Sequence, residues 1–178
     1  MVKDYTTQLR EIISHEEWLM NILRTVRGLN LPDWYLAAGV IRNTLWDVLH
    51  GYKKRTPLHD IDLVYFDPQK KVEAKKIEVL LQKKYPHFTF EVVNQAYTHE
   101  WYPYKKKARY ASDGIAHFIE TPTCIGVRLE KDDSLTICAP HGLKDLFAMH
   151  VHPISSEKEV IEKYKERMKE KQWQKIWP

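Results

Sequence analysis

Residues 34–67 limit what this chain can fold into, because four local patterns follow one another there in a fixed order. An apolar run over Trp34–Ala38 meets Gly39, and apolar residues then recur at helical spacing over Ile41–Leu49. A second apolar run, Asp60–Phe66, carries two aspartates. Short apolar runs bounded by turn residues indicate strands, whereas recurrence every three or four residues indicates a helix. The order strand, glycine turn, helix and strand predicts an α/β core.

Capping residues predict further helices around this core. Ser14–Glu17 and Ser156–Glu159 both fit a capping box, in which a serine and a glutamate three residues later cap the helix start. Asp67 and Pro68 fit the N-cap and first turn of another helix. Three more strands are expected, the last two as a hairpin: Phe88–Val93, Thr123–Leu129 and Ser134–Ala139.

These elements predict an α/β (α+β) fold in which helices flank a small mixed sheet. Residues 1–178 are expected to form one domain, with a core at about 30–100 and a C-terminal annex at about 101–178. The annex would contain the hairpin and the last helices, and would form a wall opposite the site.

Composition excludes few classes of protein. Of the 178 residues, 43% are hydrophobic and 12% aromatic, enough to fill one core. No run of about 18 apolar residues predicts a membrane span, and the charged N-terminus lacks the apolar core of a signal peptide, so we expect cytoplasmic residence. The net charge of +4 fits the handling of anionic nucleotides but does not by itself indicate nucleic acid. Cys124 and Cys138 are expected to be buried, reduced thiols.

Asp60 and Asp62 are the leading candidates for a metal site. Residues two apart in a strand project to the same face, so these carboxylates should stand side by side and repel each other unless a cation bridges them. Carboxylate oxygens with open water positions suit Mg²⁺ or Mn²⁺. The alternative is that Asp60 caps the strand and Asp62 is a charge on an edge strand.

Glu91 is the candidate for a third carboxylate, because it lies in the expected third strand among apolar neighbours. A solvent-facing glutamate on an edge strand is the alternative. Asp67 is a weaker candidate, since its expected capping role already explains it.

The glycine turn and helix start are candidates for phosphate binding. Gly39 lets a ligand approach the backbone, and the first N–H groups of a helix favour an anion. Arg42 in the first turn could bind phosphate through two hydrogen bonds, and Asn43 could bind a ribose or a phosphate. A surface salt bridge to Asp47 is the alternative for Arg42. Asn94, close after Glu91, could orient a base, a ribose or an acceptor, or else make local turn and capping bonds.

Four segments carry a family resemblance. The patterns AGxIRNxxWDxLHG, DIDxxYFD, ExxNQAxxH and APxGLxDLF stand at Ala38–Gly51, Asp60–Asp67, Glu91–His99 and Ala139–Phe147. With them the chain resembles a bacterial nucleotidyltransferase-like family of the DNA polymerase beta superfamily. The resemblance implies that Asp60, Asp62 and Glu91 bind metal and that Gly39 lies under a triphosphate. Val40 departs from the superfamily pattern, in which Gly or Ser follows the first glycine.

Two function classes follow. The first is a metal-dependent nucleotidyltransferase that moves a nucleoside monophosphate from a nucleoside triphosphate (NTP) to an acceptor and releases pyrophosphate. Two Mg²⁺ ions would then activate the acceptor hydroxyl and neutralise the leaving group. The second is a nucleotide-binding or partner-binding module without turnover, which Val40 favours. The acceptor could be a small molecule, a protein side chain or an RNA end.

Overall fold

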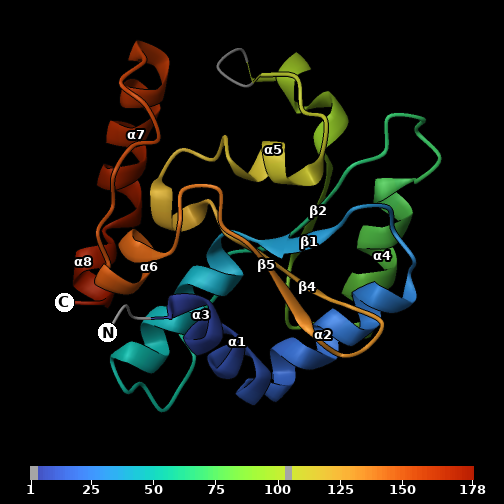
Figure 1. Ribbon diagram of the computed structural model, residues 1–178, viewed down its shortest axis with the longest axis horizontal. Coiled ribbons are helices and arrows are strands. Elements are labelled where there is room, and N and C mark those ends of the chain that lie inside the picture. Colours follow the sequence, from blue (N-terminus) through green and yellow to red (C-terminus); the bar gives the residue numbers. More distant parts are fainter. Residues whose placement is uncertain (1–3, 103–105) are drawn as a thin grey trace.

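The computed structural model describes residues 4–102 and 106–178. Its centre is a five-stranded sheet in the order β3-β2-β1-β4-β5 (Figure 1). Only β2 and β3 pair in parallel, and the other neighbours are antiparallel. The expected α/β class and small mixed sheet are therefore confirmed. The strands are β1 (Tyr35–Ala37), β2 (Ile61–Tyr65), β3 (Phe90–Asn94), β4 (Gly126–Leu129) and β5 (Leu135–Cys138).

The C-terminal hairpin of β4 and β5 belongs to this same sheet. Leu36 of β1 pairs with Val127 of β4, so the hairpin continues the sheet on the side of β1 that faces away from β2. Residues 101–178, expected as an annex, thus complete the central sheet as well as adding helices beside it.

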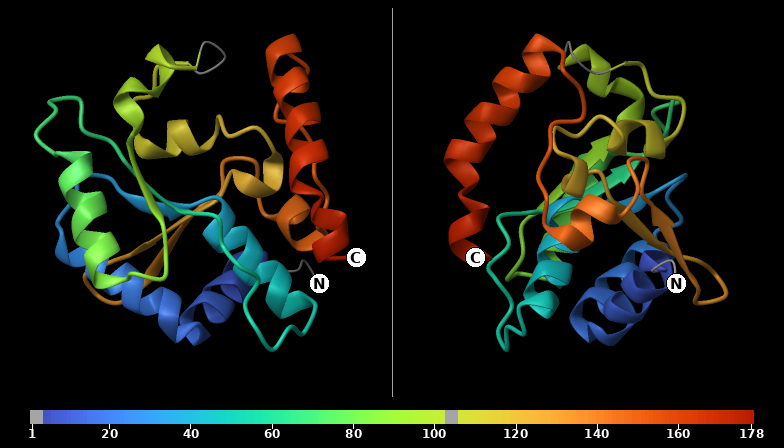
Figure 2. Two further views of the ribbon diagram at one scale, coloured as in Figure 1. Left: turned by 180° about the vertical axis from the view of Figure 1, so that it is seen from behind. Right: turned by 60° about the vertical axis from the view of Figure 1, so that its left-hand side comes forward.

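One face of the sheet carries the larger core, under four helices (Figures 1 and 2). Strand alternation sends Leu36 and Leu63 to this face, where both are fully buried. In α2 the residues at helical spacing, Leu19, Ile22 and Val26, are also fully buried against it. The four helices are α1 (Tyr5–His15), α2 (Glu17–Gly28), α3 (Gly39–Leu49) and α4 (Ala74–Lys84).

The opposite face has a smaller apolar cluster, which includes Tyr35, Ala37 and Val64. Cys124 and Cys138 also lie in this cluster as buried thiols outside any disulfide, which confirms the expectation for both. Short elements lie on or beside this face, η1 (Gln95–Glu100), α5 (Ala111–Ile115) and η2 (Thr121–Thr123), and α7 (Lys158–Lys171) borders it. The other two helices, α6 (Lys144–Ala148) and α8 (Trp173–Ile176), contribute Leu146 and Trp173 to the larger core. Across the described ranges, no helix is long and apolar enough to cross a membrane.

Both expected capping boxes are wrong. Ser14 lies inside α1, which continues to His15, and its hydroxyl donates to the carbonyl of Glu11 at 2.8 Å. The pattern fits the sequence, but a serine can cap only from outside a helix. At the other position α7 starts at Lys158, and its N-cap residue, Glu157, makes no side-chain capping bond.

The helix expected at Asp67 begins seven residues later, at Ala74, with Glu73 as its N-cap residue. Asp67 caps the preceding loop instead. Its buried carboxylate accepts hydrogen bonds from the backbone N–H groups of Gln69 at 3.1 Å and Val72 at 2.8 Å. These bonds account for the carboxylate without a metal.

Candidate active site

The turn between β1 and α3 is made by Ala38 and Gly39. Ala38 is the N-cap residue of α3 and has φ 58° and ψ −123°, a conformation that costs energy for a residue with a Cβ. Its N–H donates to the carbonyl of Ile125 at 2.9 Å, and its own carbonyl accepts from the N–H of Arg42 at 3.1 Å. These bonds hold the turn, so that α3 starts at Gly39 and presents its first N–H groups there.

Val40 does not lie in the turn. It is the second residue of α3, is fully buried and belongs to the larger core. The strained residue is Ala38 and the residue after it is Gly39, so the turn lies one position earlier than the sequence suggested. The departure assigned to Val40 therefore does not affect the surface of the site.

Asp60, Asp62 and Glu91 are held near one another by the pairing of β2 with β3. Asp62 and Glu91 are register partners on these parallel strands, and Asp60 precedes β2 by one residue. The pKa of Asp62 is raised to about 7, mainly because the side chain is buried and also because Asp60 and Glu91 repel its charge. Arg42 and Arg167 oppose this shift. Three carboxyl groups that repel one another when ionised thus lie close together, and Asp62 is near both of the others.

The sheet order decides one of the two alternatives for these carboxylates. Because β2 lies between β3 and β1, Asp62 is not on an edge strand. Glu91 does lie on the edge strand β3 and is exposed, as its alternative expected. Its position beside Asp62 nevertheless puts it in the walls of the same hollows.

The carboxylates suit Mg²⁺ or Mn²⁺ by their donor chemistry, since hard divalent cations prefer oxygen ligands. Within the described residues, however, no three His, Cys, Asp or Glu side chains converge closely enough to hold one metal ion. The pKa of Asp62 is raised mainly by burial and then by repulsion from Asp60 and Glu91, and a bound cation would oppose both effects. The donor chemistry of these carboxylates therefore suits a hard divalent cation, although their spacing in this structure does not bring three of them onto one ion.

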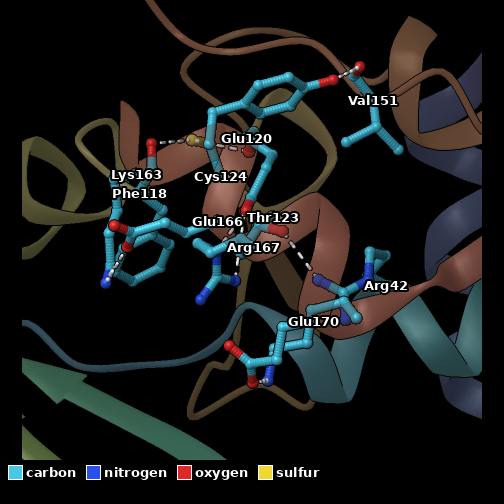
Figure 3. A network of polar contacts seen from close by, with 12 residues as sticks. Arg42, Phe118, Glu120, Thr123, Cys124, Val151, Lys163, Glu166, Arg167 and Glu170 are labelled. Carbon is cyan, nitrogen blue, oxygen red and sulfur yellow. Dashed lines mark hydrogen bonds and ion pairs between the residues drawn. The ribbon is translucent and has the colours of Figure 1, made fainter. Parts of the chain in front are cut away.

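Arg42 is buried, which excludes the surface salt bridge that was its alternative. Its Nη1 donates to Thr123 Oγ1 at 2.8 Å (Figure 3). Its Nη2 donates to Asn43 Oδ1, also at 2.8 Å, and its Nε has no partner among the described residues. The guanidinium lies 4.1 Å from the ring centroid of Trp173. Burial lowers its pKa to about 10, so it stays charged at neutral pH. Asp47 instead binds Thr56 and Trp177.

A second arginine reaches the site from the C-terminal helix α7. Arg167 donates from Nε to Oε1 of Glu120, and from Nη2 to Oε2 at 3.3 Å (Figure 3). Glu120 is 0% exposed, so the pair is anchored in the interior. Burial would lower the pKa of Arg167, but the hydrogen bond and charge of Glu120 raise it overall. Glu120 thereby fixes a permanent positive charge beside Asp62.

Two adjoining hollows meet at the carboxylates. The first, of about 330 Å³, we call the basic hollow; Gly39, Arg42, Asn43, Asp60 and Lys171 line it. The second, of about 260 Å³, we call the aromatic hollow, since its walls include the rings of residues 101, 102 and 118. Five residues line both hollows: Ala38, Asp62, Glu91, Thr123 and Arg167. A ligand in one hollow can therefore continue into the other past Asp62.

A family model described as nucleotidyltransferase matches residues 24–178. The chain belongs to this nucleotidyltransferase family. A solved structure described with the words "The NMR structure of the protein reveals a CCA-adding enzyme head domain" is similar, with a TM-score of 0.82 and 30% identity. That match covers 94% of this chain and 91% of the other. No curated protein matches.

A more distant structure, a tRNA-processing enzyme in an apo form, has a TM-score of 0.44 and 14% identity. That comparison covers 87% of this chain and 38% of the other, and says nothing about function.

Of the residues expected to bind nucleotide in this nucleotidyltransferase, Asn94 lines neither hollow. Its Nδ2 donates to the carbonyl of Asp67 at 2.7 Å, while its Oδ1 accepts from the N–H groups of Asp67 and Ala96. These are local turn and capping bonds, the alternative for this side chain. Asn94 joins the end of β2 to the start of η1 and is not brought to the site.

Sequence reasoning assigned no role to Arg167, Glu120 or Thr123. Arg167 and Glu120 are 47 positions apart, and Thr123 is 81 positions from Arg42, so no local spacing could have joined them. One further sequence signal could have found Arg167: besides the four segments above, the terminal pattern Arg167…Lys171…Trp173…Trp177-Pro178 also resembles the ending of the family.

Proposed function

We propose that this nucleotidyltransferase moves a nucleoside monophosphate from an NTP to an acceptor hydroxyl, with Mg²⁺ or Mn²⁺ held by Asp60, Asp62 and Glu91. The acceptor oxygen forms a bond to the α-phosphorus, and the bond from that phosphorus to its bridging oxygen breaks. Pyrophosphate leaves with the electron pair. The bound metal would lower the pKa of the acceptor hydroxyl and neutralise the leaving group.

The separation of charge in the site is the observation that carries this proposal. Arg42 is buried, yet among residues 4–102 and 106–178 it forms no ion pair with a carboxylate. Glu120, Asp62 and Asp60 lie near enough to oppose the lowering of its pKa, but none of them is hydrogen-bonded to it. Buried charges without a hydrogen-bonded counter-charge are costly, so Arg42 and Asp62 favour ligands of the opposite sign. A metal–triphosphate complex supplies a cation for one and an anion for the other.

The chain's own residues then have distinct roles. The start of α3 at Gly39 donates backbone N–H groups to the triphosphate, and Arg42 and Arg167 supply positive charge on either side of it. Glu120 keeps Arg167 in place. Glu91, exposed where the two hollows meet, can accept the proton of the acceptor hydroxyl. The binding-module alternative rested on Val40, which lies in the core.

The test is transfer of label from each α-³²P-labelled NTP, with Mg²⁺, into fractions of a cell lysate enriched in RNA, in protein or in small molecules. We expect one fraction to become labelled and pyrophosphate to be released in equal amount. Asp62→Asn should abolish both signals, which would exclude a contaminating enzyme. If no fraction is labelled and no pyrophosphate appears with any NTP, the proposal is wrong.

A further inference from the structure

The aromatic hollow is lined by exposed aromatic side chains, which have no role in binding phosphate. Trp101 and Tyr102 line it and are 62% and 42% exposed, which is unusual for such large apolar side chains. Phe118 forms part of another wall. Flat aromatic surfaces at a wet boundary suit the stacking of a planar heterocycle.

We propose that the aromatic hollow binds the base of the NTP, stacked on Trp101 and Tyr102 and hydrogen-bonded by Gln95. The inference rests on the proposed function, because it takes the triphosphate to occupy the basic hollow. It assigns a nucleoside subsite that phosphate contacts alone do not define.

Gln95 provides the polar half of this inference. It lines the aromatic hollow and is 1% exposed, and its Oε1 is buried without a hydrogen-bond partner in the described part of the chain. A buried carbonyl oxygen without a partner destabilises the fold, so each such group calls for an explanation. A carboxamide carries both a donor and an acceptor, as the edges of the bases do.

Gly114 in α5 shows that the carboxamide is accommodated at some cost. A Cβ at this position would lie 2.1 Å from Oε1 of Gln95 and 2.6 Å from its Cδ, so only glycine leaves room for the amide. Glycine within a helix is itself unfavourable. Oε1 is therefore packed against α5, and both unfavourable features, the oxygen without a partner and the glycine in the helix, come from keeping this amide in the wall of the hollow.

The position of the hollow favours the base of the NTP as its occupant. The aromatic hollow shares Asp62, Glu91 and Arg167 with the basic hollow. With the β- and γ-phosphates at the start of α3, the α-phosphate comes next to the carboxylates and the nucleoside extends beyond them. His117 also lines this hollow. Its Nδ1 donates to the carbonyl of Asp113 at 2.6 Å, so Nε2 is the ring nitrogen left for a contact with a base.

The first test follows the indole N–H signals of the six tryptophans by ¹H–¹⁵N NMR, with Trp101→Phe and Trp173→Phe used to assign two of them. Trp173 lines the basic hollow and Trp101 the aromatic one. Inorganic tripolyphosphate with Mg²⁺ should shift the Trp173 signal and not that of Trp101, whereas an NTP should shift both. Free nucleosides should shift Trp101 alone.

These outcomes separate the two proposals. If an NTP shifts Trp173 and leaves Trp101 unchanged, the base does not enter the aromatic hollow and the inference is overturned while the proposed function stands. If nucleosides shift Trp101 but neither NTP nor tripolyphosphate shifts Trp173, the base site stands and the proposed triphosphate site fails. If no ligand shifts either signal, both fail.

The second test compares two exposed aromatic residues by calorimetry. Trp101→Ala should weaken NTP binding about 5- to 150-fold, the range for loss of one base–aromatic stack, and leave tripolyphosphate binding unchanged. Tyr110→Ala is the matched control, since Tyr110 is 59% exposed and lines neither hollow. Gln95→Met should reduce the differences in Kd among the four NTPs. Equal NTP affinity in wild type and Trp101→Ala would contradict the assignment.

Discussion

Replacing Gly39 with alanine should strengthen the fold and weaken nucleotide binding at the same time. Gly39 is the first residue of α3 and does not have a positive φ, so alanine can adopt its backbone conformation. An added Cβ would meet only Nη2 of Arg42, at 3.7 Å, which is ordinary van der Waals contact. Gly→Ala at a compatible site stabilises by about 0.4–1 kcal/mol, chiefly because it restricts the unfolded chain. For a chain of this size the Tm should rise by about 1–4 °C.

The effect on binding has the opposite sign because the same Cβ faces the basic hollow, which Gly39 lines. A methyl group there would hold a phosphate away from the N–H groups at the start of α3. Loss of one hydrogen bond to a charged group is worth about 1.5–3 kcal/mol. The Kd for an NTP with Mg²⁺ should therefore rise about 10- to 150-fold.

The assay combines thermal unfolding with calorimetry, using a non-hydrolysable NTP analogue and Mg²⁺. Gly28→Ala is the matched control, because Gly28 ends α2, lacks a positive φ and has nothing within 4 Å of an added Cβ. That variant should gain stability without any change in Kd. If Gly39→Ala folds normally and binds the analogue as wild type does, the triphosphate does not lie against the start of α3.

Three further outcomes are expected. Glu91→Gln should lower the rate of pyrophosphate release at least about 100-fold, because loss of a positioned acid–base group costs on that order, while the Kd for the NTP with Mg²⁺ changes little. Asp62→Asn should reduce the rate and also weaken NTP binding. If Glu91→Gln transfers nucleotide as fast as wild type, Glu91 has no part in the mechanism. Glu120→Gln leaves Arg167 without its carboxylate and should lower the free energy of unfolding by about 3 kcal/mol in urea titrations. The control Glu166→Gln breaks the exposed pair with Lys163 and should lower it by less than about 1 kcal/mol. Similar losses in the two variants would show that the buried pair is unimportant for stability. Native Asp62 keeps its proton up to about pH 7, whereas in the unfolded chain this group loses it near pH 3.8. The free energy of unfolding of the metal-free protein should therefore fall as the pH rises from about 4 to 7, and Asp62→Asn should remove that fall. The same pH profile in the variant and in wild type would refute the raised pKa.

The local patterns of the sequence predicted the core of the fold because their causes are local. Strand alternation requires no knowledge of the rest of the chain, and it placed Asp62 and Glu91 in two successive strands. The structure pairs these strands in parallel and makes the two residues register partners. Helix starts were less predictable, since a capping pattern does not reveal whether the preceding residues are already helical. Ser14 shows this directly, because α1 runs past it to His15.

The difference of one residue between the expected and the observed position of the turn has a different physical origin. A positive φ is expected of glycine, so Gly39 was the natural candidate for the turn. The structure instead places the positive φ at Ala38, where two backbone hydrogen bonds, to Ile125 and from Arg42, outweigh the local cost. Tertiary contacts of this kind are absent from any local pattern. With the turn placed at Gly39, comparison with the superfamily pattern assigned Val40 a functional meaning, whereas the structure buries Val40 in the larger core.

The site also contains residues from the C-terminal third of the chain. Their place beside Asp62 could not be inferred from the spacing of residues in the sequence. Asp62 and Glu91 are fixed by strand pairing alone, but the positive side of the site depends on Thr123, which holds Arg42, and on Glu120, which holds Arg167. Both partners lie at η2, immediately before β4, and β4 pairs with the same strand β1 that leads into Gly39. The hairpin therefore does more than extend the sheet. Because the hairpin fixes η2 against the β1–α3 turn, it sets the distance between the two arginines and the carboxylates. A substitution that changes the packing of β4 should therefore alter the Kd for nucleotide, even though it replaces no residue that lines the basic hollow.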